Sequence, residues 1–167
     1  MAEIEIRKIP AHVVYRAEYD VKGVDDFFDP ETDRNILYDL QYLMEDENPD
    51  VHVPEDGEDY NYFEYPYPEN PDGTVHIVYR DMVDAKGKDN ADGAYVFEEV
   101  PEIEAAVLYH VGRFDSVGEG FAKVYDWIDS NGYEIIGPGR VSAIHGPWDR
   151  ENPDEYANEC QVPVRKK

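Results

Sequence analysis

One order of elements occurs twice along the chain, and this repeat constrains the fold more than any other feature of the sequence. Each half opens with two strand-like runs joined at a proline, "EIEIRKIPAHVVYRAEY" in the first and "YVFEEVPEIEAAVLYHV" in the second. Ile9-Pro10 and Val100-Pro101 take the same place in the two halves. A helix-like segment and two further strand-like runs follow in both. Such self-similarity indicates the duplication of one structural unit.

The strand-like runs are rich in β-branched and aromatic residues, a composition that suits a half-buried pleated surface. They are "EIEIRKI", "HVVYRAEY", "YNYFEYPY", "TVHIVYRDMV", "YVFEEV", "IEAAVLYHV", "RVSAIHG" and "ECQVPV". Asn-Pro-Asp occurs three times between them. It predicts loops, because the residue before proline is extended and Asp favours turns.

Two segments have apolar residues at helical spacing. The first, "DPETDRNILYDLQYLMED", has Asp29 as its N-cap and Pro30 at its first helical position. Its apolar stripe is Ile36, Leu37, Leu40, Leu43 and Met44. The second, "DSVGEGFAKVYDWIDSNG", is expected to end at a left-handed Gly132. Its stripe is Val117, Phe121, Val124, Tyr125 and Ile128. Gly118 and Gly120 weaken its first turn by about 1 kcal/mol each relative to Ala, which close packing against a sheet would explain.

These patterns predict a single α+β domain over residues 1–167, built from duplicated β-α-β-β halves. The halves are residues 1–84 and 94–167, and the acidic segment 85–93 joins them. We expect an antiparallel sheet with two main helices on one face and a groove between the halves. A chain of 167 residues is long enough to bury a core.

The charge of the chain is strongly negative, with 39 acidic and 15 basic residues and a formal net charge of -24. This balance argues against direct nucleic-acid binding, which needs clustered Lys and Arg. The acids are spread through loops, which favours a solubilising coat; recognition of a basic protein partner and attraction of cationic ligands are the alternatives. The chain has no apolar run of the ~18 residues that a membrane helix needs. The start "MAEIEIRKIPAHVV" has no signal-peptide pattern, so a cytoplasmic protein is expected.

No cofactor and no metal are expected from the sequence. The five histidines lack metal-ligand spacing, and Lys86 and Lys88 stand where a calcium loop needs acids. The single Cys160 excludes an intrachain disulfide and is expected to be an inert strand residue. His110, just before the turn at Gly112, is expected to form a hydrogen bond there instead of acting in catalysis.

The C-terminal run "YANECQVPVRKK" places a glutamate in the middle of a predicted strand. Cys160, Val162 and Val164 form the apolar face of that strand. On composition alone, Glu159 belongs to the solvated side of an edge strand, because Glu is rarely buried without a partner.

Three motifs in a fixed order resemble the GyrI-like effector-binding family of small-molecule-binding domains. They are a strand ending in "YHVGRF", a helix ending in "WIDSNGY" and a final "ExxxPV". The resemblance covers residues 95–167 and, more weakly, "IRKIPAHVVYRAEY" and the first helix. The family includes the ligand domains of MerR-type and AraC-type multidrug regulators and stand-alone proteins such as the gyrase inhibitor. The resemblance implies that Glu159 points into a cavity between the halves and meets cationic or polar ligands there.

The resemblance also implies aromatic walls for this cavity, at Tyr109 and Phe114. From the residues themselves, Tyr62 or Tyr65 of the tyrosine-rich run is a further wall and Trp148 a lid; ordinary core or surface packing is the alternative for all of them. The predicted ligand-binding residues are therefore Glu159, Tyr109, Phe114, Trp148, Tyr62 and Tyr65. At two places the sequence departs from the family pattern, and both bear on whether the site selects flat aromatic cations. Gln161 replaces a frequent aromatic, and Val141 and Ser142 stand where regulators commonly carry an acid.

The leading functional hypothesis is a stand-alone small-molecule-binding protein for lipophilic, aromatic or cationic compounds. A DNA-binding segment does not fit into a chain that the duplicated domain already fills. One alternative is a hydrolase of reactive cyclopropane-bearing compounds with Glu159 as general base, but no second catalytic residue is evident and we lean against an enzyme. The other is an acidic interaction module for a basic protein, like the gyrase inhibitor. The oligomeric state stays open.

Overall fold

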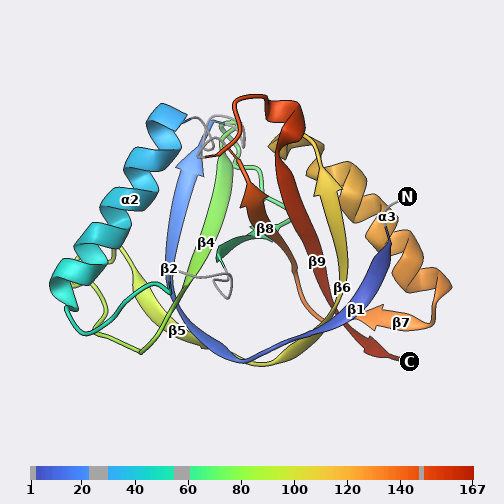
Figure 1. Ribbon diagram of the computed structural model, residues 1–167, viewed down its shortest axis with the longest axis horizontal. Coiled ribbons are helices and arrows are strands. Elements are labelled where there is room, and N and C mark those ends of the chain that lie inside the picture. Colours follow the sequence, from blue (N-terminus) through green and yellow to red (C-terminus); the bar gives the residue numbers. More distant parts are fainter. Residues whose placement is uncertain (1–2, 23–29, 55–60, 147–148) are drawn as a thin grey trace. The chain divides into compact units, whose positions relative to one another are not determined.

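The computed structural model describes residues 3–22, 30–54, 61–146 and 149–167 (Figure 1). Within these ranges the chain forms nine strands, two α-helices and two 3-10 turns. Every named strand pairing is antiparallel. The fold is therefore mixed α+β, as the sequence predicts. None of the described helices is long and apolar enough to cross a membrane.

The first of two compact units comprises Met1–Pro10, Glu64–Pro66 and Glu102–Lys167. Its sheet has the order β1 (Ile4–Ile9), β6 (Ile103–Val111), β9 (Ala157–Lys166) and β8 (Gly139–His145), with β7 (Tyr133–Ile135) also paired to β9. The helix α3 (Val117–Ser130) follows the 3-10 turn η1 (Phe114–Ser116) and packs on β6 and β9. A second 3-10 turn, η2 (Pro153–Glu155), precedes β9.

The apolar stripe of α3 confirms the predicted helix. Its buried residues are Val117, Gly120, Phe121, Val124 and Ile128, whereas Tyr125 is half-buried. A methyl group added to Gly120 would lie 2.8 Å from Cys160 Sγ, so the helix touches β9 at this point. Gly132 adopts the left-handed conformation expected after the helix, with a φ of 77°. The close packing that was expected at the start of the helix is thus found at Gly120.

The second unit comprises Ala11–Phe63 and Tyr67–Pro101. Its strand order is β3 (Asn61–Tyr65), β4 (Val75–Val83), β2 (His12–Val21) and β5 (Val96–Val100), and the end of β3 belongs to the first unit. The helix α2 (Pro30–Glu47) buries Leu40 and Met44, but Leu43 is 39% exposed. The buried stripe is thus narrower than predicted at its C-terminal end. Asp29 and the side chains of Ile36 and Leu37 lie outside the described part.

Polar contacts of Asn48 fix the end of α2. Asn48 Nδ2 donates to the Met44 carbonyl and to the Tyr95 hydroxyl, both at 3.1 Å, and Tyr95 in turn donates to Glu47 at 2.6 Å. The Lys88 amide donates to Asn48 Oδ1 at 2.7 Å. The acidic segment 85–93 is thereby tied to the helix by its backbone.

The two prolines singled out in the sequence mark two of the points at which the chain passes from one unit to the other. In the first unit β1 pairs with β6, so that Ile9 is aligned with Ile103. In the second unit β2 pairs with β5, so that His12 is aligned with Val100. The chain therefore changes unit just after Pro10 and again just after Pro101. Each sequence half supplies strands to both units.

Candidate functional site

Glu159 lies on the face of the first unit's sheet that is opposite α3. On this face Glu159 is aligned with Tyr109 of β6 and with Ser142 of β8. The next residue, Cys160, points toward α3, where its Sγ lies 3.9 Å from the Val117 carbonyl. Successive side chains of a strand point to opposite faces. We call the surface formed by Arg7, Tyr109, Ser142, Glu159 and Gln161 the Glu159 face.

The Glu159 carboxylate is partly buried and has two partners on this face. Arg7 Nη1 donates to Oε1 at 2.9 Å and to Oε2 at 3.0 Å, and Gln161 Nε2 donates to Oε1 at 3.0 Å. The Glu159 side chain is 17% exposed. β9 runs between β6 and β8 and is not an edge strand. The interpretation from composition alone, a solvated glutamate on an edge strand, is therefore wrong.

Arg7 is the residue of this site that the sequence analysis missed. Its hydrogen bond to Glu159 is the main cause of a raised pKa for its guanidinium, a second bond to Glu5 adds to it, and burial opposes the rise. Arg7 and Glu159 are 152 positions apart in the chain. The alternating charges of "EIEIRKI" were the one available signal, and they do not show which strand lies beside β1.

Aromatic and apolar surface adjoins the carboxylate. Tyr109 is 46% exposed and Val111, two residues further along the same strand, is 59% exposed. Ser142 and Gln161 on this face are buried. A paired carboxylate beside an exposed phenol ring and an exposed aliphatic side chain suits an amphipathic small molecule, since ligand sites combine apolar walls with a few polar groups.

The other predicted ligand-binding residues lie elsewhere. Phe114 is buried in η1 and packs on Tyr156, with the ring centroids 5.1 Å apart. Tyr65 stacks on Phe121 of α3, with the centroids 4.0 Å apart. Tyr62 is buried in the second unit.

The structure therefore brings together two of the predicted residues that it describes, Glu159 and Tyr109, which are aligned on neighbouring strands. Trp148 lies outside the described residues, so its predicted role as a lid stays a prediction.

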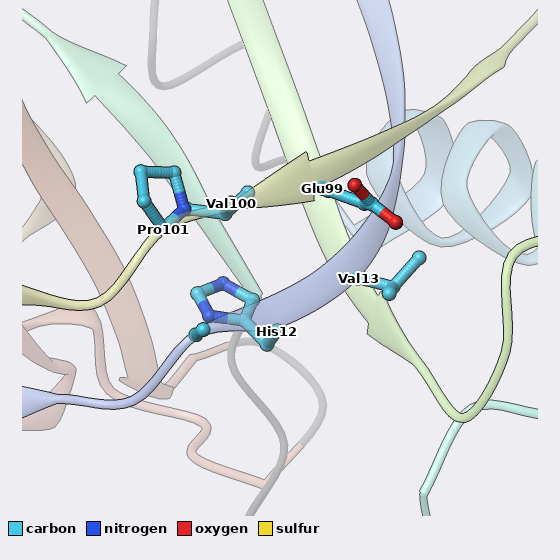
Figure 2. A pocket seen from close by; sticks show the side chains of 6 residues that line it. His12, Val13, Glu99, Val100 and Pro101 are labelled. Carbon is cyan, nitrogen blue, oxygen red and sulfur yellow. The ribbon is translucent and has the colours of Figure 1, made fainter.

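The second unit has a surface pocket with a volume of about 490 Å³. It is lined by Ala11, His12, Val13, Glu99, Val100 and Pro101 (Figure 2). His12 is aligned with Val100 and Glu99 with Val13, so the imidazole and the carboxylate leave the strands on opposite faces. His12 Nε2 is also hydrogen-bonded to the Tyr62 hydroxyl at 3.1 Å. These two groups do not converge on a common atom and form no acid–base pair.

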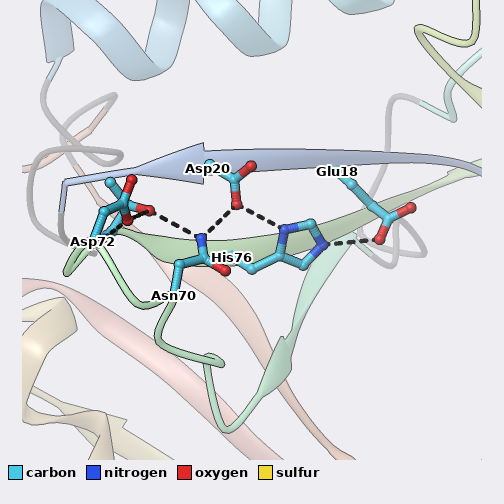
Figure 3. Close-up of polar contacts among 6 residues, drawn as sticks. Glu18, Asp20, Asn70, Asp72 and His76 are labelled. Atoms are coloured by element: carbon cyan, nitrogen blue, oxygen red, sulfur yellow. Dashed lines mark hydrogen bonds and ion pairs between the residues drawn. The ribbon is translucent and has the colours of Figure 1, made fainter.

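A polar cluster ties β2 to β4 in the second unit (Figure 3). His76 Nε2 bonds Glu18 and His76 Nδ1 bonds Asp20, both at 2.9 Å, and Asn70 Nδ2 donates to Asp20 at 2.8 Å. The bonds to Glu18 and then to Asp20 raise the pKa of His76. Among the residues that the structure describes, no three His, Cys, Asp or Glu side chains are placed to hold a metal ion.

His110 and Cys160 lie under α3, on the side of the sheet away from the Glu159 face. His110 Nε2 and Ser116 Oγ are hydrogen-bonded at 2.8 Å, which confirms the predicted bond, and burial lowers the pKa of His110. Burial raises the pKa of the Cys160 thiol to about 12. A thiol with this pKa stays protonated at neutral pH, in agreement with an inert strand residue.

Comparisons with solved structures find the same fold in several proteins. The C-terminal domain of EcmrR has 23% identity and a TM-score of 0.79, and the match covers 100% of this chain and 99% of that one. A hydrolase from Listeria innocua has 11% identity and a TM-score of 0.56, with 98% and 92% covered. SAV2435 bound to tetraphenylphosphonium has 14% identity and a TM-score of 0.52, with 98% and 94% covered. A search of curated proteins finds no match.

A comparison with protein families is more specific. Residues 50–165 match the GyrI-like small molecule binding domain. This range includes α3, most of the strands and the candidate residues Tyr109 and Glu159. The match spans well over half of the chain, which therefore belongs to the GyrI-like family of small-molecule-binding domains.

Proposed function

We propose that the chain binds a small lipophilic cation on the Glu159 face, with Glu159 as the polar anchor and Tyr109 as the aromatic wall. One observation carries the proposal: a partly buried carboxylate is aligned with an exposed tyrosine on the sheet face opposite α3. Membership of a small-molecule-binding family supports a ligand role. The binding of tetraphenylphosphonium by SAV2435, a protein of the same fold, supports the choice of a cation.

The physical chemistry of the face favours this ligand class. A carboxylate that is largely removed from water attracts a cation more strongly than an exposed one does. A tyrosine ring adds a cation–π attraction of about 0.5–2 kcal/mol, depending on how far the pair is desolvated. The net charge of -24 raises the local concentration of cations and disfavours direct nucleic-acid binding.

We favour binding over hydrolysis because both carboxylate oxygens of Glu159 already accept hydrogen bonds. Oε1 accepts from Arg7 and Gln161, and Oε2 accepts from Arg7. A general base needs an oxygen within hydrogen-bond reach of the water that it activates. A cation that displaces Arg7 takes its place on Oε2, so we assign Glu159 to ligand recognition and not to proton transfer.

Isothermal titration with biphenyl carboxamidinium and its neutral analogue biphenyl carboxamide tests the proposal. We expect the wild-type protein to bind the cation more tightly than the amide, and Glu159→Gln to lose about tenfold or more in affinity for the cation. Glu104→Gln is the matched control. It removes an exposed carboxylate from β6, at a position whose side chain lies on the other face of the sheet from Tyr109, and should bind as wild type does. Unchanged affinity in Glu159→Gln would exclude Glu159 as the anchor.

A further inference from the structure

Glu159 already holds a cation that belongs to the chain itself. A single nitrogen of Arg7, Nη1, donates to both carboxylate oxygens, at 2.9 and 3.0 Å. A cationic ligand that reaches Glu159 must therefore displace this guanidinium. Opposite charges that are partly removed from water interact strongly, so this displacement lowers the net affinity for any cation.

Arg7 has a second partner that makes the displacement feasible. Its Nη2 donates to Glu5 Oε1 at 2.8 Å, and Glu5 is two residues away on the same strand and therefore on the same face. The Arg7 side chain is 39% exposed and that of Glu5 is 62% exposed. Arg7 can give up its bonds to Glu159 while it keeps the bond to Glu5 and gains contact with water. Its charge stays paired in both positions.

The two oxygens of Glu159 differ once Arg7 has left. Oε1 retains the bond from Gln161 Nε2, but the one donor that reaches Oε2 in the described part of the chain is Arg7 Nη1. The Glu159 side chain is 17% exposed with Arg7 in place, and a ligand that displaces Arg7 covers Oε2 in turn, so water does not compensate this oxygen. An incoming cation must therefore bring an N–H donor for Oε2. Amidinium and guanidinium groups do so with donors in a planar fork.

We propose, building on the function proposed above, that Arg7 competes with the ligand for Glu159 and so limits the affinity of the Glu159 face for cations, and that the donor needed at Oε2 decides which cations bind best. The face selects cations that carry N–H donors, such as amidinium and guanidinium groups. It binds quaternary ammonium and phosphonium ions more weakly, because they balance the charge of Glu159 but do not replace the hydrogen bonds of Arg7.

Two cations with the same aromatic part test this specificity, namely biphenyl carboxamidinium and biphenyl trimethylammonium. The wild-type protein should bind the amidinium about tenfold or more tightly than the trimethylammonium ion, which corresponds to one charge-assisted hydrogen bond. Arg7→Met keeps the aliphatic part of the side chain and removes the competitor. It should bind both cations about tenfold more tightly than wild type does.

Lys8→Met is the matched control for Arg7→Met. It removes one positive charge from the neighbouring position of β1, where the ammonium is 3.9 Å from Glu102 and the side chain is 66% exposed. Its affinities should equal those of wild type. Equal affinities of the two cations in wild type would overturn the donor requirement at Oε2, and no gain in Arg7→Met over Lys8→Met would overturn the competition by Arg7.

The pattern of failure separates this inference from the proposed function. If the amidinium binds and Glu159→Gln abolishes binding, but Arg7→Met changes nothing, the inference alone fails. If neither cation binds to wild type or to Arg7→Met, both fail. The free energy of unfolding without ligand is an independent readout. Arg7→Met should lower it, because the Glu159 carboxylate loses its cationic partner. The double variant Arg7→Met with Glu159→Gln should recover part of the loss, because the unpaired charge is then removed. No restoration would overturn the pairing on which the inference rests.

Discussion

Tyr109 and Glu159 are aligned across the β6–β9 pairing and lie on the same face of the sheet. The tyrosine is 46% exposed, whereas the glutamate side chain is 17% exposed and paired with Arg7. The Tyr109 ring is therefore exposed directly beside a carboxylate that is largely buried. A ligand that reaches Glu159 meets Tyr109 on one side.

Replacement of Tyr109 by Leu should weaken the binding of biphenyl carboxamidinium by about 0.5–2 kcal/mol, because the cation–π attraction is lost while apolar contact remains. Tyr109→Phe keeps the aromatic face and should retain most of the affinity. Isothermal titration of both variants measures the difference. Tyr42→Leu, at a 62% exposed tyrosine of α2 in the other unit, serves as control. Equal affinities for Tyr109→Leu and Tyr109→Phe would exclude an aromatic contribution at this position.

Gly120→Ala should destabilise the protein, although Ala is the better helix former by about 1 kcal/mol. The added methyl group would lie 2.8 Å from Cys160 Sγ and 3.2 Å from His110 Nδ1, inside the contact of α3 with the sheet. Overpacking of this kind costs about 1–3 kcal/mol. Urea denaturation measures the free energy of unfolding.

Gly118→Ala is the natural comparison for Gly120→Ala, since both glycines lie in the first turn of α3. A methyl group at position 118 would meet the Tyr65 hydroxyl at 3.3 Å, at the far end of a side chain that can move. Gly118→Ala should therefore be neutral or stabilising by up to about 1 kcal/mol. If Gly120→Ala were as stable as Gly118→Ala, the tight packing of α3 on β9 would be refuted.

The local pattern of the sequence was sufficient to predict most of the elements. Alternation in the last strand placed Cys160, Val162 and Val164 on a common apolar face, and all three are fully buried. The helical stripe of α3 and the left-handed Gly132 were also predicted correctly. These features depend on side chains within one turn or one strand, where periodicity and backbone preferences act directly.

The features that were missed depend on contacts between distant parts of the chain. The pairing of β1 with β6, and with it the bond from Arg7 to Glu159, follows from strand order and register, which no local pattern specifies. β7 has three residues, Tyr133–Ile135, too few to show alternation. Leu43 lies on the predicted stripe of α2 but is 39% exposed, because tertiary packing decides how wide the buried stripe is.

Asn158→Leu should stabilise the protein by about 1–2 kcal/mol. Asn158 is fully buried, and neither Nδ2 nor Oδ1 has a hydrogen-bond partner among the described residues. Replacement of an unpaired buried amide by an apolar side chain of similar size removes its desolvation cost. Gln161→Leu, three positions further along β9, removes a donor from Glu159 and should have the opposite effect. Urea denaturation of the two variants checks both signs, and lower stability of Asn158→Leu would show that its amide is hydrogen-bonded in solution.

The stability that His76 provides should decrease between about pH 6 and pH 9. Its bonds to Glu18 and then to Asp20 raise the pKa of His76 in the folded state, so the folded protein binds this proton more tightly than the unfolded chain does. The contribution is therefore complete below the unfolded pKa of about 6.5 and is lost as the pH rises through the folded pKa. Denaturation of wild type and His76→Gln at both pH values gives the difference in unfolding free energy. His110, whose pKa is lowered by burial, is common to both proteins and cancels in that difference. In an NMR titration, Glu18→Gln should bring the pKa of His76 down toward its ordinary value. If the stability advantage of wild type over His76→Gln grew with pH, the stabilising role of protonated His76 would be contradicted.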